Sequence, residues 1–317
     1  MTFVHESPEW GDLLQIVARA FDRDLGMVEK DYWVTHALWA LHDQGFEVWF
    51  KGGTSLSKGF GLIERFSEDI DARVDAGRSG LSDPKLSWSN KKAGIAERDA
   101  WFDALARTLA VPGCFVARDV AGSDAQVRSA SLTVRYPALH AHTLHEDMRP
   151  YVLLEIGRAR VVPFVPRDLS SWVHDHLARV GALARFTDNR PRAVRCIHPW
   201  VTCLEKLDAI ARRFERDQPA PDFVRHYEDA ARILAAWDDL APPAMDLQAL
   251  LVALAAEDGK RMPAATHPAF QVDPESARWQ ELERAWERIG PMFWGPRTEL
   301  GAACASIQAF LASLPAD

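Results

Sequence analysis

The spacing of apolar residues changes near Pro166, and this change limits the folds open to the chain. Before it, short segments alternate apolar and polar residues, most clearly at 69–74, which is typical of strands with one buried face. After it, apolar residues recur with helical spacing, as they do along 200–214. We therefore predict an α+β domain over residues 1–165 and a helical domain over residues 166–317.

Shorter stretches of the same two patterns define the individual elements. Helices are expected at 9–21, 27–44, 96–110, 200–214, 223–234, 246–257, 274–290 and 297–313, and strands at 46–50, 69–74, 113–119, 127–136 and 150–157. Residues 78–98 are basic around Trp88, which suits either a solvated loop or a contact with nucleic acid.

The composition is that of an ordinary globular protein, with 48% hydrophobic and 26% charged residues. The formal net charge of −8 gives no general attraction to nucleic acid or to an anionic membrane, so such a partner needs a local basic patch. The N-terminus lacks the features of a signal peptide, and the longest apolar run, 249–256, is far shorter than a membrane span. Four cysteines without a CxxC pair fit a reducing compartment. We expect a cytoplasmic protein with no membrane partner.

A glycine-rich turn follows the strand expected at 46–50. Paired glycines let the backbone approach an anion closely, and a helix that starts there directs its free N–H groups at that anion. Hydroxyl and ammonium groups in the same turn add donors and positive charge. The turn suits a nucleoside triphosphate, although a plain tight turn with Thr54 as a helix cap accounts for it as well. The candidate nucleotide-binding residues here are Lys51, Gly52, Gly53, Thr54 and Ser55.

Asp69 and Asp71 are two residues apart on an expected strand, so both carboxylates project from the same face. Two negative charges this close repel each other unless a cation lies between them. Oxygen ligands favour Mg²⁺ or Mn²⁺, usually shared with substrate phosphates. The alternative is an exposed edge strand with two surface acids. The apolar opposite face of the strand favours the metal site, because it fixes the strand against a core.

The segments 51–58 and 65–71, taken together, resemble the signature of the AbiEii/AbiGii-type nucleotidyltransferase toxins. These are the toxin halves of bacterial toxin–antitoxin and abortive-infection systems, and the resemblance is close across residues 29–75. It implies a polymerase-β-like nucleotidyltransferase fold, in which a mixed sheet with flanking helices is followed by a helical C-terminal domain that closes the active-site cleft.

Shorter matches at 153–157, 203–207 and 225–229 extend the resemblance to three further residues, Glu155, Lys206 and Asp229. It implies that Glu155 is a third metal-binding carboxylate, that Lys206 and Arg65 stabilise the triphosphate, and that Asp229 is catalytic. Taken without the resemblance, the same residues also suit structural roles. Glu155 suits a surface strand end, Lys206 a solvated helix position, and Asp229 an i,i+4 ion pair with Arg225.

The resemblance implies metal-dependent transfer of a nucleotidyl group from an NTP to an acceptor such as RNA, for example a tRNA 3′ end, under the control of a cognate antitoxin. The catalytic residues would be Asp69, Asp71, Lys206 and Asp229, with Asp69, Asp71 and Glu155 binding the metal. Two alternatives stay open. One is a nucleotidyltransferase that modifies a small molecule such as an antibiotic, and the other is a non-catalytic NTP-binding regulator.

Overall fold

The computed structural model describes residues 1–67, 69–84, 89–120, 125–146 and 148–314, so the centre of the basic segment around Trp88 lies outside the described residues. The chain forms two compact units. The first contains Met1–Gly59, Ser67–Val161 and Val165–Cys196, and the second contains Phe60–Phe66, Val162–Phe164 and Ile197–Asp317. The first holds a mixed sheet with helices and the second is helical, so the predicted α+β class is confirmed. The first unit continues to Cys196, beyond the expected domain boundary at residue 165.

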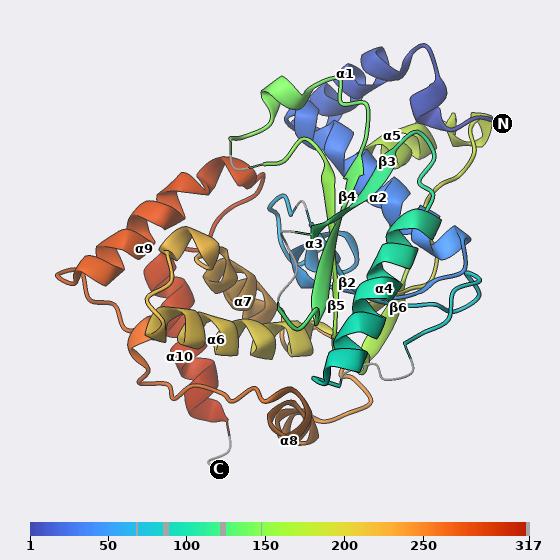
Figure 1. Cartoon of the computed structure of the whole chain (residues 1–317). Coiled ribbons are helices and arrows are strands. Elements are labelled where there is room, and N and C mark those ends of the chain that lie inside the picture. The colour runs from blue at the N-terminus through green and yellow to red at the C-terminus, as the bar shows by residue number, and fades with distance from the viewer. Residues whose placement is uncertain (68, 85–88, 121–124, 147, 315–317) are drawn as a thin grey trace. The chain divides into compact units, whose positions relative to one another are not determined.

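Among the described residues, the first unit forms a seven-stranded sheet with the order β3-β4-β5-β2-β1-β7-β6. β1 and β2 pair antiparallel, whereas β2 and β5 pair parallel, and β2, β5 and β4 run side by side in Figure 1. The strands are β1 (Glu47–Lys51), β2 (Asp69–Asp75), β3 (Phe115–Asp119), β4 (Ser129–Arg135), β5 (Val152–Gly157), β6 (Phe164–Arg167) and β7 (Val194–Ile197). The five strands expected from the sequence are confirmed as β1 to β5.

The strand register assigns successive residues to opposite faces of this sheet. Ala72 on β2 is paired with Ile156 on β5, and both are buried. One position earlier, Asp71 is paired with Glu155 and, on its other side, with Lys51 of β1. One face of the sheet is therefore apolar, and the other carries charged side chains.

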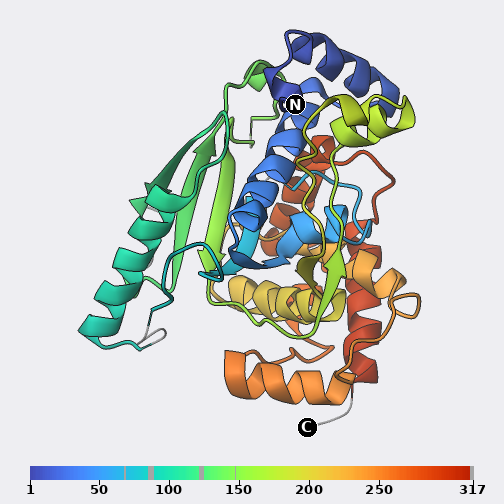
Figure 2. The same cartoon turned by 90° about the vertical axis from the view of Figure 1, so that its right-hand side faces the viewer.

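The apolar face is covered near β3 by α4 (Lys92–Thr108). Arg118 of β3 is in register with buried Leu132, so its side chain lies on the apolar face. There it forms ion pairs with Asp99 and Asp103 of α4, with N–O distances of 2.7 and 2.8 Å. Figure 2 shows α4 running alongside the strands that follow it. The remaining helices of the first unit are α1 (Trp10–Phe21), α2 (Leu25–Asp43), α3 (Gly52–Lys58), α5 (Trp172–Arg179), η1 (Val4–Glu6), η3 (Ala141–Thr143) and η4 (Leu183–Arg185).

Three elements of the first unit were not expected from the sequence: β6, β7 and α5. β6 and β7 have four residues each, too few to show alternation, and β7 contains Arg195. β7 is held in the sheet by parallel pairing with β1, which lies far away in the sequence. β7 therefore lies within residues 166–317, which the sequence pattern predicted to form a helical domain.

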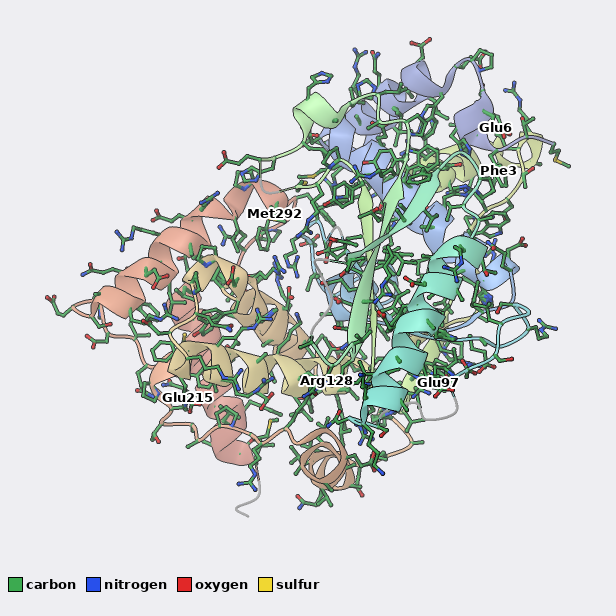
Figure 3. The ribbon with its side chains drawn as sticks, in the orientation of Figure 1. Phe3, Glu6, Glu97, Arg128, Glu215 and Met292 are labelled. Carbon is green, nitrogen blue, oxygen red and sulfur yellow. The ribbon has the colours of Figure 1, made fainter. Side chains whose placement is uncertain are left out.

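The second unit confirms the helices expected in the C-terminal half. They are α6 (Pro199–Glu215), α7 (Arg225–Ala235), α8 (Leu247–Asp258), α9 (Ala277–Arg288) and α10 (Leu300–Ser313), with η5 (Ala220–Asp222), η6 (Pro268–Phe270) and η7 (Gly290–Met292). The segment Phe60–Phe66 joins them through backbone hydrogen bonds. Phe66 N–H donates to the carbonyl of Met292, labelled in Figure 3, at 2.7 Å, and Trp294 N–H donates to Glu64 O at 2.9 Å. No helix among the described residues is long and apolar enough to cross a membrane.

A buried hydrogen-bonded network joins the N-terminal segment, α2 and α5 inside the first unit. Asn189 Nδ2 donates to Tyr32 Oη at 3.1 Å and to His36 Nδ1 at 2.8 Å, and its Oδ1 accepts from His174 Nε2 at 2.8 Å. Tyr32 in turn donates to His5 Nδ1 at 2.7 Å. In this arrangement His5 and His36 both accept hydrogen bonds, so both are neutral. Burial lowers the pKa of His5 and His174 to about 4 and that of His36 to about 3.

This network predicts acid-labile folding. Each of the three histidines binds a proton more weakly in the folded than in the unfolded chain. Their contribution to stability is therefore complete above the unfolded pKa of about 6.5 and is lost as pH falls towards 4. Urea unfolding from pH 7 to pH 4 should show this loss. His174→Gln should reduce the pH slope of the unfolding free energy by up to one proton, about 1.4 kcal/mol per pH unit. The exposed control His142→Gln should keep the wild-type slope, and an equal slope in all three proteins would contradict the account.

Candidate active site

The predicted carboxylates gather on the polar face of the sheet. Asp69 and Asp71 lie on the same face of β2, and Glu155 lies beside Asp71 on β5. The same register places Lys51 beside Asp71 on β1. The sequence prediction that the two aspartates share a face is therefore confirmed, and a third acid adjoins them.

Gly52 fixes the position of Asp71. It has a φ of +76°, a conformation that favours glycine. A Cβ atom at this position would overlap Asp71 Oδ2, which leaves no room for any side chain. The first glycine of the turn is thus required both by its backbone conformation and by the carboxylate that lies against it.

Thr54 positions the start of β2. Its hydroxyl donates to the carbonyls of Ser67 and Asp69 at 2.9 and 2.6 Å, and the side chain is buried. The single hydroxyl proton is therefore used within the fold rather than offered to a phosphate. The expected cap at Thr54 is wrong, because α3 begins at Gly52 with Lys51 as its N-cap residue.

Two further polar side chains of α3, Ser55 and Lys58, also face the interior of the first unit or contact its residues. Ser55 is buried within the first unit. Lys58 forms an ion pair with Asp31 of α2, and its ammonium group also donates to Thr35 Oγ1 at 3.0 Å. The polar chemistry available near the turn therefore comes from its backbone, from Lys51 and from the carboxylates of β2.

The three carboxylates repel one another. Partial burial and the charges of Asp71 and Asp69 raise the pKa of Glu155 to about 7, against a weaker opposite effect of Arg149. Arg149 Nη1 lies 3.1 Å from Asp69 Oδ1 and forms an ion pair with it. The sequence pattern did not indicate Arg149, because it precedes β5 in a segment with no regular spacing.

The donor set fits a divalent cation that is only partly bound by protein. No three His, Cys, Asp or Glu side chains in the described part of the chain stand together as a ready metal site. Two carboxylates from one strand nevertheless suit Mg²⁺, which usually takes one or two carboxylates and completes its shell with water and phosphate oxygens. The excess negative charge that raises the pKa of Glu155 favours the same conclusion.

A second charged cluster lies within the second unit. The Arg65 Nε and Nη2 atoms donate to the two oxygens of Asp229 at 2.8 and 2.7 Å, a bidentate pair. Lys206 Nζ lies 2.7 Å from Asp229 Oδ2 and 3.3 Å from His226 Nδ1. Among the described residues, Asp229 pairs with these two cations and not with Arg225. The sequence prediction brought together three residues that the structure joins directly.

The electrostatics of this cluster limit what Asp229 can do. Burial alone would raise the pKa of the Asp229 carboxyl, but the charges of Arg65 and Lys206 outweigh it and hold the pKa well below its usual range. Burial lowers the pKa of Lys206, against the opposing effect of Asp229, and places that of His226 well below its ordinary value. A carboxylate with so little proton affinity and both oxygens engaged is poorly suited to accept a proton. It is well suited to hold two cations in place.

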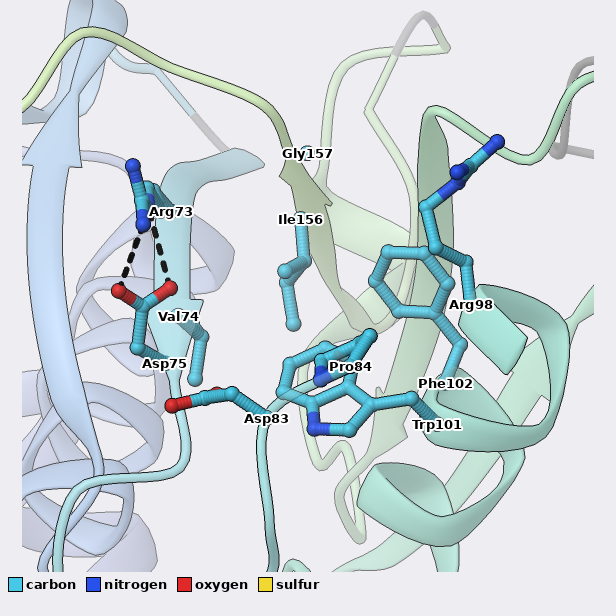
Figure 4. A pocket seen from close by; sticks show the side chains of 10 residues that line it. All are labelled: Arg73, Val74, Asp75, Asp83, Pro84, Arg98, Trp101, Phe102, Ile156 and Gly157. Atoms are coloured by element: carbon cyan, nitrogen blue, oxygen red, sulfur yellow. Dashed lines mark hydrogen bonds and ion pairs between the residues drawn. The ribbon is translucent and has the colours of Figure 1, made fainter. Parts of the chain in front are cut away.

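A cavity of the first unit is separate from these carboxylates. It has a volume of about 200 Å³ and lies between β2, β5 and α4. Figure 4 shows Val74 and Ile156 beside Trp101 and Phe102 of α4, with none of the three acids in its lining. The cavity belongs to the apolar face of the sheet, so its size does not make it the candidate site.

The residues singled out by the sequence resemblance thus lie in two groups, one on the polar face of the sheet and one around Asp229. The chain belongs to the family described as nucleotidyl transferase AbiEii toxin of type IV toxin–antitoxin systems, whose family model matches residues 37–311. It is therefore a nucleotidyltransferase. Among solved structures, it is similar to MenT4, a nucleotidyltransferase toxin from Mycobacterium tuberculosis H37Rv. The two are 18% identical over 94% of this chain and 98% of that chain, with a TM-score of 0.40. No curated protein matches the chain.

Gly52→Ala should impair catalysis more than folding. The added methyl group would displace the Asp71 carboxylate, and misplacing a reacting group by about 1 Å commonly costs about a hundredfold in rate. Gly80→Ala is the matched control, because Gly80 has a φ of +87° and an added methyl group there would meet nothing within 4 Å. Both variants should lose similar stability in thermal unfolding, but only Gly52→Ala should lose nucleotidyl transfer. Retained transfer in Gly52→Ala would refute the role given to this glycine.

Asp229→Asn should destabilise the protein strongly. It removes the shared negative charge from two buried cations, a change that typically costs about 3–5 kcal/mol. Asp168→Asn is the control, because Asp168 pairs with Arg192 at the surface and its loss should leave the urea midpoint almost unchanged. A midpoint for Asp229→Asn close to that of wild type, together with lost activity, would instead assign Asp229 a direct chemical role.

Proposed function

We propose that this nucleotidyltransferase uses Mg²⁺ or Mn²⁺ to transfer a nucleotidyl group from an NTP to RNA, such as a tRNA 3′ end. The proposal is carried by the Asp69–Asp71 pair on the polar face of β2, with Asp71 locked against Gly52. In a member of the AbiEii family, such a pair is best explained as the binding site for the metal that accompanies the nucleotide.

Asp69 and Asp71 are the proposed metal ligands, with Glu155 beside them as the third carboxylate. A bound divalent cation would neutralise charge on the phosphates as the nucleotidyl group leaves. Gly52 and Gly53 are the proposed backbone contacts of a phosphate, and Lys51 adds positive charge next to Asp71. Thr54 supports this arrangement from within the fold, because its hydroxyl fixes the start of β2.

Lys206 and Arg65 are the proposed ligands of the triphosphate in the second unit. Together with Asp229 they carry two positive charges and one negative charge, so the cluster retains one net positive charge. Cations held on packed elements bind phosphate with little loss of side-chain entropy. Asp229 then acts as a positioning residue that orients both cations.

The family supports the proposed regulation. Its type IV toxin–antitoxin membership supports a toxin that is restrained by a cognate antitoxin, and we place its action in the cytoplasm, where NTPs and RNA are available. The net charge of −8 suits RNA only through local basic groups, and it suits a cationic small molecule at least as well. A transfer assay must therefore supply both RNA and a cationic small molecule as acceptors.

The purified protein should incorporate labelled NTP into total RNA when Mg²⁺ or Mn²⁺ is present. Asp71→Asn should lower the rate by roughly a hundredfold or more, because it removes a metal ligand. Asp75→Asn is the matched control, since Asp75 lies on the same face of β2 but pairs with Arg73. Scintillation counting of separated RNA and small-molecule fractions measures the outcome.

Each outcome of this assay assigns the activity. Label in an aminoglycoside but not in RNA would identify a small-molecule enzyme, and no transfer with any of the four NTPs would favour an NTP-binding regulator. Expression of the wild type without its antitoxin should also slow bacterial growth, whereas Asp71→Asn should not. Equal toxicity of both proteins would separate growth inhibition from nucleotidyl transfer.

A further inference from the structure

Arg149 lies against the carboxylate that is proposed to bind metal. Its Nη1 atom is 3.1 Å from Asp69 Oδ1 and 3.5 Å from Asp69 Oδ2, so one N–H group faces both oxygens. The Arg149 side chain is 44% exposed, whereas that of Asp69 is 19% exposed. The guanidinium therefore contacts the oxygens of Asp69 from the more exposed side of the pair.

The backbone of Arg149 is held much more firmly than its side chain. Lys30 of α2 is fully buried, and its Nζ donates to the carbonyl of Arg149 at 2.7 Å. The neighbouring Glu29 is also buried and accepts N–H groups from Leu139 and His140, both at 2.8 Å. A buried charge is costly unless it is hydrogen-bonded, so these contacts fix both ends of the segment from 139 to 149 on α2.

The charges of the polar face explain why a cation belongs at this position. Asp69, Asp71 and Glu155 place three carboxylates on adjacent strands, and Arg149 offsets one of these charges. A divalent cation bound to Asp69 needs the same oxygen lone pairs that Arg149 now contacts. The two cations therefore compete for Asp69.

We propose that Arg149 is a built-in counter-ion of Asp69 in the metal-free enzyme, and that a divalent cation binds by displacing its guanidinium. The inference rests on the proposed function, because it takes Asp69 as a metal ligand. Its consequence is that Arg149 weakens metal binding in the absence of nucleotide. The fixed backbone keeps the displaced guanidinium near the site, where the phosphates that arrive with the metal provide a new anionic partner.

Mn²⁺ titration of the nucleotide-free, full-length protein, followed by electron paramagnetic resonance of free Mn²⁺, tests this competition. Arg149→Gln should bind Mn²⁺ about three- to tenfold more tightly than wild type, because a positive charge next to the metal is removed. Arg149→Lys keeps that charge and should stay close to wild type. The matched control is Arg192→Gln, which removes an exposed arginine that also lies 3.1 Å from an aspartate, Asp168. Its Mn²⁺ affinity should equal that of wild type.

The outcomes separate this inference from the proposed function. Equal or weaker Mn²⁺ binding by Arg149→Gln would overturn the counter-ion role, while metal-dependent transfer by the wild type would leave the function standing. Equal tightening by Arg192→Gln would also overturn it, since the effect would then be one of general charge. If neither wild type nor Arg149→Gln bound Mn²⁺ and the wild type transferred no nucleotide, both the inference and the proposed function would fail. Tighter binding by Arg149→Gln alone would support the inference directly.

Discussion

The contact between Gly52 and the Asp71 carboxylate is the constraint on which the candidate site depends. It requires a left-handed backbone at the end of β1, a residue without a side chain there, and a β2 register that brings Asp71 alongside. Thr54, in the helix that follows the turn, stabilises this β2 register because its hydroxyl donates to the carbonyls of Ser67 and Asp69. The glycine turn and the aspartate strand are therefore one structural unit, and the spacing between them in the sequence reflects a physical contact.

Charge is handled differently in the two units. On the polar face of the sheet, Asp69, Asp71 and Glu155 lie close together; burial and then the charges of the two aspartates raise the pKa of Glu155, and Asp69 forms an ion pair with Arg149. In the helical unit, Asp229 is outnumbered by Arg65 and Lys206, and its pKa is held low. The two clusters therefore carry uncompensated charge of opposite sign.

The sequence was informative where local spacing determines structure. The alternation in β2 correctly placed Asp69 and Asp71 on one face, and the helical stripes gave α6 and α7 nearly their correct extents. The sequence was not informative where the position of a residue depends on a contact that is distant in the sequence. From the sequence, the hydroxyl of Thr54 could donate a hydrogen bond to a phosphate. In the structure it donates instead to the carbonyls of Ser67 and Asp69. Arg149 has no local signal, because Lys30, more than a hundred positions earlier, brings it to the site. β7 is too short to recognise without β1 beside it.

The bidentate pair of Arg65 with Asp229 joins residues that are 164 positions apart. This separation has a consequence for synthesis on the ribosome. Arg65 emerges together with β1 and β2, but its carboxylate partner is made only after the whole sheet has been translated. The segment Phe60–Phe66 therefore has no helical unit to join until residues 197–317 have been made. The cation cluster is among the last parts of the molecule to form, so a nascent chain acquires its acidic face well before it acquires the cations proposed to bind the triphosphate.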